Sequence, residues 1–295
     1  MANLKEIRVR RESVASTRQI TSAMKMVAAA KLKKAQDAIL QLRPYAEKLQ
    51  EILGSISGSL KSDEENVYAR EREEENVLIV LITSNRGLCG AFNSNAIKAA
   101  IHAALETYST QMMAGQVHFV AIGKKGNDFL RRNGYNIIHN GSELFDELTF
   151  ENSAQIAQMI MDLYVEEEYD HVDLVYNQFR NAATQILTTE QFLPISIEEL
   201  ADGDTPTVNA DYIFEPSKEY ILQEMVPRSL KLQFYKAIRD SFASEHGARM
   251  TAMHKATDNA TEMMKELALE YNKARQAAIT NEIIEIVGGA EALSG

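Results

Sequence analysis

The sequence predicts an α/β protein in which a domain with a mostly parallel sheet interrupts a long antiparallel coiled coil of two helices. Three observations lead to this prediction: two long stretches almost free of glycine and proline, a coiled-coil spacing of apolar residues, and short apolar runs that alternate with helical segments. The chain has 295 residues, 45% of them hydrophobic and 25% charged. This composition excludes a disordered chain, a collagen and a disulfide-stapled small protein.

The first stretch predicts a helix about 75 Å long, from residue 3 to residue 53. No glycine precedes Gly54 and no proline precedes Pro44. Residues 1–53 carry 11 Lys and Arg against 5 Asp and Glu, although the whole chain has a net charge of −11. A basic N-terminal helix in an otherwise acidic chain suggests that this helix binds an acidic partner. An apolar stripe along this helix consists of Leu4, Ile7, Val14, Thr21, Ala28, Leu32, Ala35, Ile39 and Leu42.

The second stretch predicts a helix on the order of 100 Å long, from residue 217 to residue 287. Between Pro227 and Val287 only Gly247 interrupts it. Its apolar and small residues follow a 4-3-4-3 spacing, which is typical of a coiled-coil seam. The two long helices are the obvious partners of each other, because an isolated helix gains little stability from propensity alone. The seam residues are Met253, Thr257, Ala260, Met264, Leu267, Tyr271, Ala274 and Ala278.

The middle of the chain predicts a Rossmann-like α/β domain with a mostly parallel sheet. Short apolar runs such as Val77–Ile82 are typical of buried parallel strands, and helical segments separate them. About 140 residues suffice to bury a core of this kind. The expected strands are 76–83, 117–122, 134–138, 172–176 and 185–189, and the expected helices are 93–108, 124–132 and 153–168.

These elements divide the chain into six segments. The N-terminal coiled-coil helix takes residues 1–55, the α/β domain residues 76–197, and the C-terminal coiled-coil helix residues 217–287. Residues 56–75 and 198–216 are polar and acidic, and we expect both to be solvated linkers without a site. Residues 288–295 form a tail.

The sequence offers little support for an active site. The spacing G-x-G-x-x-G of dinucleotide-binding turns is absent, and Gly123-Lys124-Lys125-Gly126 lacks the ending of a P-loop, so we expect a tight turn with two exposed lysines. The six histidines form no close ligand pair, and one cysteine excludes a thiolate cluster. Cys89 has no acid–base partner nearby in sequence, which favours a small core residue over a nucleophile. We therefore expect no catalytic residue, metal or cofactor.

Three stretches resemble the gamma subunit family of F-type ATP synthases. The first is Ile20–Leu32, the second is the turn Ser84–Asn93, close to the family's S-D-R-G-L-C-G-G-F-N, and the third is Tyr271–Val287. His246–Met253 is also similar to the family. Asn85 replaces the usual Asp and Ala91 the second Gly of a pair, which puts the detailed geometry of the turn in doubt.

The resemblance implies a mechanical role. The two long helices would form a left-handed shaft inside a ring of three alpha and three beta subunits, and the α/β domain would be a foot that binds the epsilon subunit and the c-ring. Transmembrane flow of ions such as H⁺ would turn the shaft and drive ATP synthesis or hydrolysis on beta. The protein would be a peripheral subunit on the cytoplasmic face of a bacterial inner membrane. With Cys89 alone, it lacks the regulatory cysteine pair of chloroplast members.

The resemblance also implies which residues make contacts. Arg275, Gln276, Thr280 and Glu282 resemble the family's contacts to a beta-subunit loop. Met24, Lys25 and Arg249 match positions that face an acidic lever of beta, and the basic residues Arg18, Lys31, Lys33 and Lys34 would suit the same surface. The family turn contributes Arg86, Gly87, Cys89, Gly90 and Asn93.

Two other functions stay open at this point. An α/β nucleotide-binding enzyme with helical extensions would bind ATP or a dinucleotide as an isolated chain. A coiled-coil adaptor or nucleic-acid binder would bind DNA through residues 1–53 in a salt-dependent way, although that arm has almost no aromatic residue on which bases could stack.

Overall fold

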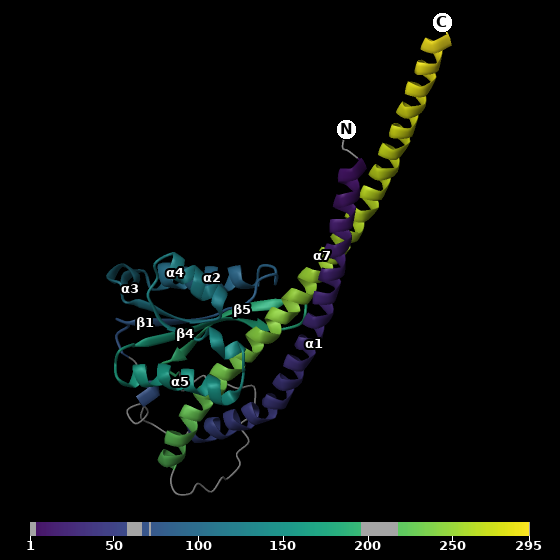
Figure 1. Ribbon diagram of the computed structural model, residues 1–295. Helices are drawn as coiled ribbons and strands as arrows, with labels where there is room; N and C mark the ends of the chain where they lie inside the picture. Colours follow the sequence, from purple (N-terminus) through teal and green to yellow (C-terminus); the bar gives the residue numbers. More distant parts are fainter. Residues whose placement is uncertain (1–3, 58–66, 71, 196–217, 295) are drawn as a thin grey trace. The chain divides into compact units, whose positions relative to one another are not determined.

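The computed structural model describes residues 4–57, 67–70, 72–195 and 218–294. It contains two compact units, one formed by residues 1–29 with 249–295 and the other by residues 30–248. The helices α1 (Leu4–Ser57) and α7 (Lys218–Ser294) contribute to both units (Figure 1). The expected linker 198–216 lies outside the described residues.

The first unit is an antiparallel pair of helices, which we call the helical pair. The hydroxyl oxygens of Thr21 and Thr257 lie 2.8 Å apart, and the guanidinium of Arg11 lies 5.5 Å from the ring centroid of Tyr271. Moving toward the N-terminus on α1 therefore means moving toward the C-terminus on α7. The predicted antiparallel pairing of the first and last helices is confirmed.

The predicted seam is also confirmed. Met253, Ala260 and Leu267 are at most 7% exposed, and the intervening seam residues are half-buried. On α1, Ile7, Thr21 and Ala28 are the most buried positions of the helical pair. The 4-3 spacing thus identifies the face that the two helices bury against each other.

The helix α7 continues beyond residue 287, where we expected a tail to begin. It runs through Gly288 and Gly289 to Ser294. Each glycine costs a helix about 1 kcal/mol relative to alanine. The residues that follow, Ala-Glu-Ala-Leu, are strong helix formers and offset this cost.

The second unit contains a five-stranded sheet with the order β3-β2-β1-β4-β5. The first four strands are parallel, and β5 pairs with β4 in the antiparallel direction. This is the mostly parallel sheet that the alternating pattern predicts. The strands are β1 (Val77–Ile82), β2 (Val117–Ile122), β3 (Ile137–Asn140), β4 (His171–Phe179) and β5 (Gln185–Leu193).

Helices cover both faces of this sheet (Figure 1). One face packs against α2 (Phe92–His102), the π-helical turn η3 (Ala103–Thr107) and α4 (Lys124–Arg132). The short helix α3 (Ser109–Ala114) lies on the same side. The other face packs against α5 (Phe150–Val165), the 3-10 turn η4 (Ser142–Phe145) and parts of α1 and α7. We call the sheet with α2–α5 the α/β domain.

Gly247 in α7 has a packing role. A Cβ atom at this position would lie 3.1 Å from both the Cα and the carbonyl oxygen of Ala182, in the turn between β4 and β5. Real Cβ contacts are rarely that short. The glycine lets the α7 backbone approach this turn closely, and this outweighs its cost in helix propensity.

Two predicted elements differ in detail. The third strand was expected at 134–138, but Gly134 adopts a φ of 75° in a turn, and β3 begins at Ile137. The expected helix 93–108 is broken after His102 by the π-helical turn η3. At its end, the hydroxyl of Tyr108 donates a hydrogen bond to buried Asp173, which is a tertiary contact that helix propensity cannot anticipate.

Much of the described end of the linker 56–75 is exposed, but it also makes contacts with the α/β domain that we did not expect. It contains the 3-10 turn η2 (Val67–Ala69), in which Ala69 is buried. The hydroxyl of Tyr164 donates to the carbonyl of Arg70, and Arg72 donates to the carbonyl of Tyr164 and lies over its ring. The acidic composition of this segment gave no sign of these contacts, because they are made by Arg72, the buried Ala69 and backbone groups.

Candidate functional site

The exposed part of α7 carries four of the residues expected to contact beta. Arg275, Gln276, Thr280 and Glu282 are all exposed. At 3.6 residues per turn they fall within an arc of about 160° on the helix surface. The hydroxyl of Thr280 donates to the carbonyl of Gln276, one turn earlier, and so points along the helix. These residues share one broad face.

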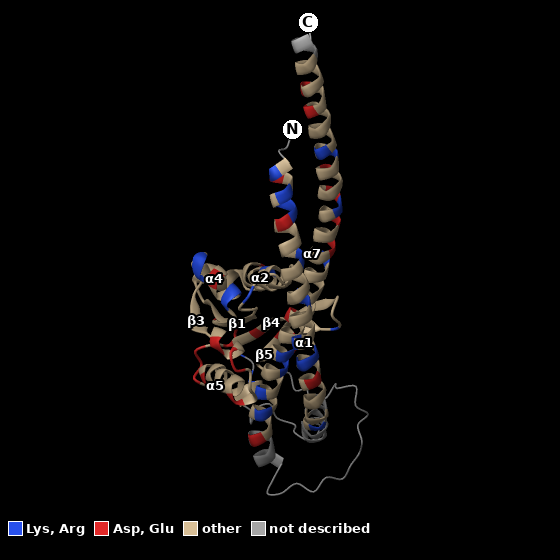
Figure 2. Ribbon diagram, turned by 45° about the vertical axis from the view of Figure 1, so that its right-hand side comes forward, with Lys and Arg blue, Asp and Glu red and all other residues tan. Residues whose placement is uncertain are grey.

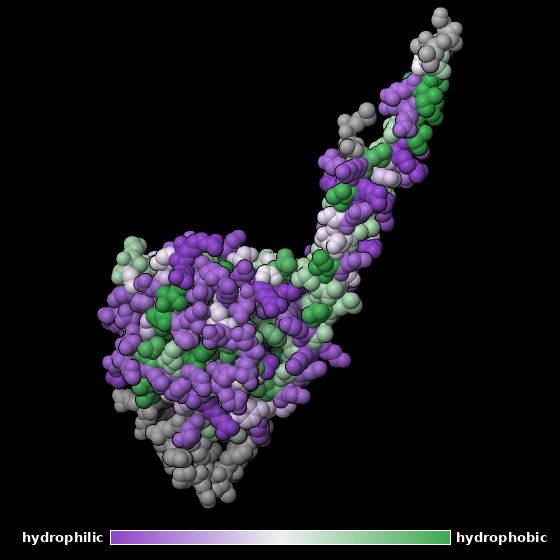
Figure 3. Space-filling view, in the orientation of Figure 1, coloured by the Kyte–Doolittle hydropathy of each residue, from purple (hydrophilic) through white to green (hydrophobic). Residues whose placement is uncertain are grey.

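The same face is apolar between these polar groups. Residues 279–290 are all exposed, and within them Ile279, Ile283 and Ile286 are 49%, 55% and 70% exposed. Figure 3 shows hydrophobic side chains along this end of α7. Exposed apolar residues in such a row are typical of a protein interface.

The remaining expected contacts lie elsewhere on the helical pair. Met24 and Lys25 are half-buried, whereas Arg249 is only 8% exposed. Most of the Arg249 side chain is therefore buried within this chain. Blue segments in Figure 2 mark the basic residues along the first part of α1. The structure brings Met24 and Lys25 to the same helix but does not place them with Arg275 and Gln276.

The family turn 84–93 is a closed network at the end of β1. The side-chain oxygen of Asn93 accepts from the Ser84 backbone N–H at 2.9 Å, and its amide nitrogen lies 3.3 Å from the sulfur of Cys89. The Ser84 hydroxyl donates to the carbonyl of Arg86. Cys89 is 2% exposed, which agrees with the predicted core role. Ser84 and Asn93 thus fix the path of the turn.

This network holds an exposed leucine in an unusual conformation. Leu88 has a φ of 63°, and its side chain is 64% exposed. A non-glycine residue in this region costs about 1 kcal/mol or more. Gly90, also at positive φ, and the exposed Arg86 and half-buried Gly87 belong to the same turn.

Asn85 makes contacts that the family's usual Asp could make only in part. Its side-chain oxygen accepts from the Lys124 backbone N–H at 2.9 Å, and its amide nitrogen donates to the carbonyl of Ser142 at 2.8 Å. An aspartate carboxylate has no proton to donate to Ser142. The substitution therefore adds one hydrogen bond that ties the turn to η4.

The Gly123–Gly126 segment is the start of α4 and not the separate tight turn that we expected: Gly123 precedes the helix, and Lys124 to Gly126 form its first turn. Gly123 has a φ of 108°, and the backbone N–H of Gly126 donates to the hydroxyl of Thr83 at 2.8 Å. Lys124 and Lys125 are exposed. Both glycines pack against Thr83, so close packing explains their presence without a phosphate ligand.

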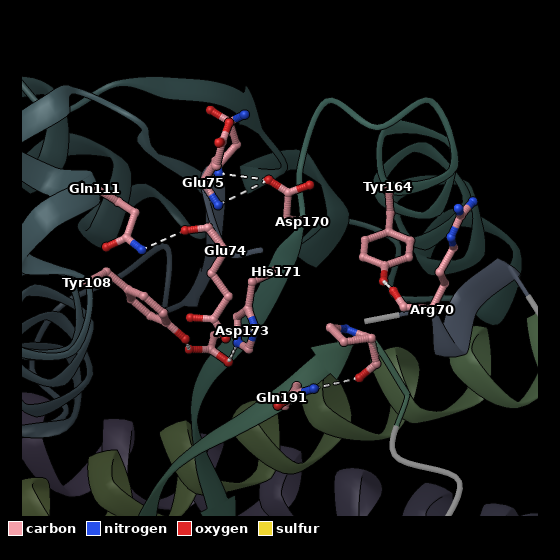
Figure 4. A network of polar contacts seen from close by, with 12 residues as sticks. Arg70, Glu74, Glu75, Tyr108, Gln111, Tyr164, Asp170, His171, Asp173 and Gln191 are labelled. Carbon is pink, nitrogen blue, oxygen red and sulfur yellow. Dashed lines mark hydrogen bonds and ion pairs between the residues drawn. The ribbon is translucent and has the colours of Figure 1, made fainter. Parts of the chain in front are cut away.

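A second polar network lies at the start of β4 (Figure 4). The Nε2 atom of His171 lies 3.0 Å from a carboxylate oxygen of Asp173, and Nδ1 lies 3.3 Å from Glu74. The hydroxyl of Tyr108 donates to the other oxygen of Asp173 at 2.7 Å. Asp170 accepts from the backbone N–H groups of Glu75 and Asn76. The network therefore ties residues 74–76 to the sheet.

Burial and charge act in opposite directions on His171. Burial alone would lower its pKa, but the hydrogen bond and charge of Asp173, together with the charge of Glu74, outweigh burial and raise the pKa above its ordinary value of 6.5. Burial beside Asp173 also raises the pKa of Tyr108. Sequence reasoning missed this network. Its only signal was His171 and Asp173 at alternate positions of one strand, which places them on the same face.

The raised pKa predicts how stability depends on pH. A group whose pKa is higher in the folded state stabilises the fold below its unfolded pKa and loses that contribution as the pH rises through the folded pKa. Since the Glu74 side chain is 51% exposed, we expect a coupling free energy of only about 0.5–1 kcal/mol between His171 and Glu74 at pH 6, and a much smaller one at pH 9. A double-mutant cycle with His171→Gln and Glu74→Gln, followed by urea denaturation, measures it. Equal coupling at both pH values contradicts the prediction.

The described residues show two further features. Among them, no group of three or more His, Cys, Asp or Glu side chains could hold a metal ion. None of the helices found in that part of the chain has the length and hydropathy needed to span a bilayer.

Comparison with known proteins gives a consistent result. A family model described as ATP synthase matches residues 3–293. The ATP synthase gamma chain of Flavobacterium psychrophilum is 62% identical over the full length of both chains, and that of Flavobacterium johnsoniae is 60% identical. The gamma chain of Chloroherpeton thalassium is 47% identical over 99% of both chains.

Solved structures also match. A chain of the Tetrahymena thermophila mitochondrial ATP synthase central stalk and c-ring is 27% identical, with a TM-score of 0.57 over 80% of this chain and 99% of that one. A chain of the Euglena gracilis mitochondrial ATP synthase has a TM-score of 0.68 over 98% of this chain and 94% of that one, and at 23% identity it shows the fold. With a family model that matches nearly every residue and full-length bacterial relatives of this similarity, the chain belongs to the ATP synthase gamma chain family.

Proposed function

We propose that this chain is the central rotor shaft of an F1Fo ATP synthase, which couples transmembrane ion flow to conformational changes at catalytic sites on neighbouring subunits. One observation carries the proposal: the first and last helices pair in the antiparallel direction, as the contact of Thr21 with Thr257 shows. Two paired helices resist bending and twisting better than one. The catalytic chemistry belongs to the beta subunits, and this chain transmits force.

The ring of three alpha and three beta subunits is the proposed partner of the helical pair. An exposed apolar helix face, such as the one with Ile279, Ile283 and Ile286, is typical of a surface that packs against apolar residues of a partner protein. Arg275, Gln276, Thr280 and Glu282 supply polar contacts on that face. The basic residues Arg18, Lys25, Lys31, Lys33 and Lys34, together with Met24, are proposed to meet acidic surfaces of beta. Arg249 is proposed to do so only through the small part of it, 8%, that is exposed.

Asymmetry gives the shaft its effect on the ring. Three equivalent sites adopt different states only when something at their centre contacts each of them differently. The face that carries Arg275 differs from the opposite face of α7, where Asn281 and Glu285 lie. As the shaft turns, each beta subunit in sequence meets a different set of side chains, and its affinity for nucleotide changes accordingly.

The foot and the location complete the proposal. The α/β domain is proposed to bind the epsilon subunit and the c-ring, and the family turn with Arg86, Gly87, Cys89, Gly90 and Asn93 to hold a fixed shape at its surface. The protein is proposed to be a peripheral subunit on the cytoplasmic face of a bacterial inner membrane. Purification of the complex from membranes, with one copy of this chain beside three alpha and three beta chains, tests these partners.

Removing two proposed contacts should uncouple the shaft. We expect Arg275→Ala with Gln276→Ala to lower proton-driven ATP synthesis in membrane vesicles several-fold while the complex assembles normally. Both side chains are exposed, so the fold should be unaffected. Asn281→Ala with Glu285→Ala, on the opposite face of the same helix, is the matched control and should leave synthesis unchanged. Normal synthesis in the first double variant, with assembly verified, contradicts the contact assignment.

A further inference from the structure

An apolar row begins in the core on α2 and becomes exposed where the chain continues into η3. The face toward the sheet is lined by alanines, including Ala96 and Ala100 of α2 and Ala104 of η3, which are all fully buried. The large apolar side chains Ile97 and Ile101 of α2 and Leu105 of η3 recur every four residues and so form one row. Along this row exposure increases from 8% at Ile97 to 52% at Leu105.

The π-helical turn η3 extends this row outward. The backbone N–H of Tyr108 donates to the carbonyl of Ala103, five residues earlier. Such turns are rare and frequently lie at functional sites. Ala103 and Ala104 still face the core, whereas Leu105 points to solvent. A leucine presented in this way is available to a partner.

Helix α4 forms the opposite wall of a groove. Phe129 is 37% exposed there, while its neighbour Leu130 is buried in the core. The groove between α2 and α4 has a volume of about 700 Å³ and runs from Asn93 on α2 to Glu106 on η3. Since each helical residue advances 1.5 Å, this length is about 20 Å, or three to four turns of a helix.

Three basic residues, Lys98, Lys125 and Arg132, line the groove in a domain that is otherwise acidic. Residues 54–217 contain ten Lys and Arg, and five of them lie on these two helices. Figure 2 shows the blue residues on α4, and Figure 3 shows the hydrophilic surface above it. The groove also contains two acids, Asp128 and Glu106, and the latter lies 2.9 Å from His102. The five basic residues are Lys98, Lys124, Lys125, Arg131 and Arg132.

We propose that the groove between α2 and α4 binds an acidic amphipathic helix of a partner protein. Its apolar residues would pack on Ile101, Leu105 and Phe129, and its flanking carboxylates would face Lys98, Lys125 and Arg132. Binding of an amphipathic helix in a groove is a recurrent recognition mode, and complementary charge selects the partner. The proposal goes beyond the rotor function, because it concerns a surface of the α/β domain that the helical pair does not form.

Photo-crosslinking in the assembled complex tests the proposal. The photoreactive amino acid p-benzoylphenylalanine replaces Leu105, the complex is irradiated in intact cells, and mass spectrometry identifies the attached peptide. We expect a peptide from a helix with apolar residues three and four apart and an excess of Asp and Glu. Met113 on α3 is 86% exposed and serves as the control position for random collisions.

Charge reversal then distinguishes the effect of the charges that line the groove from the effect of the overall electrostatic field of the α/β domain. Lys98→Glu with Lys125→Glu and Arg132→Glu should lower the yield of that crosslink at least five-fold. Lys124→Glu with Arg131→Glu changes exposed charges of the same helix outside the groove and should lower it much less. The proposal is wrong when position 105 crosslinks no more than position 113. A lipid, a nucleic acid or a basic peptide at position 105, or an unchanged yield after the triple reversal, overturns it equally.

Discussion

Replacing Gly123 with alanine should lower the free energy of unfolding of the α/β domain by about 4 kcal/mol or more. The new Cβ atom would lie 2.3 Å from the carbonyl oxygen of Thr83 and 2.8 Å from its hydroxyl oxygen. The backbone φ of 108° adds strain for any residue with a side chain. Thr83 cannot move away easily, because its backbone N–H donates to the carbonyl of Ile122 at 2.7 Å.

Gly115→Ala is the matched control for this substitution. Gly115 also has a positive φ, of 76°, but no atom lies within 4 Å of an added Cβ. We expect it to cost only about 1 kcal/mol, which is the backbone strain alone. Urea denaturation followed by circular dichroism measures both variants. A similar cost for the two would mean that Gly123 is required for its φ and that the contact with Thr83 is unimportant.

Glycine at two seam positions should open the helical pair. Ala260→Gly costs about 1 kcal/mol in helix propensity, and Leu267→Gly loses the packing of a side chain that is 3% exposed as well. Together they should destabilise the helical pair by about 5 kcal/mol. Hydrogen exchange of residues 4–29 and 249–278 measures this loss directly, because the protection of these backbone amides reports opening of this unit.

One alanine-to-glycine and one leucine-to-glycine change at exposed positions of α7 serve as the control for the two seam substitutions. Ala277→Gly with Leu269→Gly alters the same residue types, and both positions are exposed. We expect a loss of about 2 kcal/mol from helix propensity alone. If both double variants lose protection equally, the packing of Leu267 does not stabilise the pair, and the seam runs elsewhere.

The long helices could be predicted from the sequence because their signals are local and repeated. A missing glycine or proline is visible in the sequence, and the 4-3 spacing from Met253 to Ala278 recurs over many turns. The strands were visible for a related reason: a parallel strand buried on both faces, such as β1, is a continuous apolar run. Each signal lies within the element that it predicts.

The features that were missed depend on residues far apart in sequence. The π-helical turn ends at Tyr108, whose partner Asp173 lies on β4. The packing of residues 67–76 depends on Tyr164 of α5 and Asp170 at the start of β4. The groove between α2 and α4 exists only because the sheet brings the two helices together. No local pattern records which distant partner a tyrosine or an acidic segment meets.

The exposed isoleucines near the end of α7 have a consequence for how cells produce this protein. A newly made chain has an exposed apolar surface near the end of α7, since Ile283, Ile284 and Ile286 are each more than half exposed. Chains that have not yet assembled with other subunits should aggregate through these apolar surfaces. Synthesis of this chain in proportion to the subunits that cover this apolar surface, or a chaperone that binds the surface, would keep the concentration of unassembled chains low.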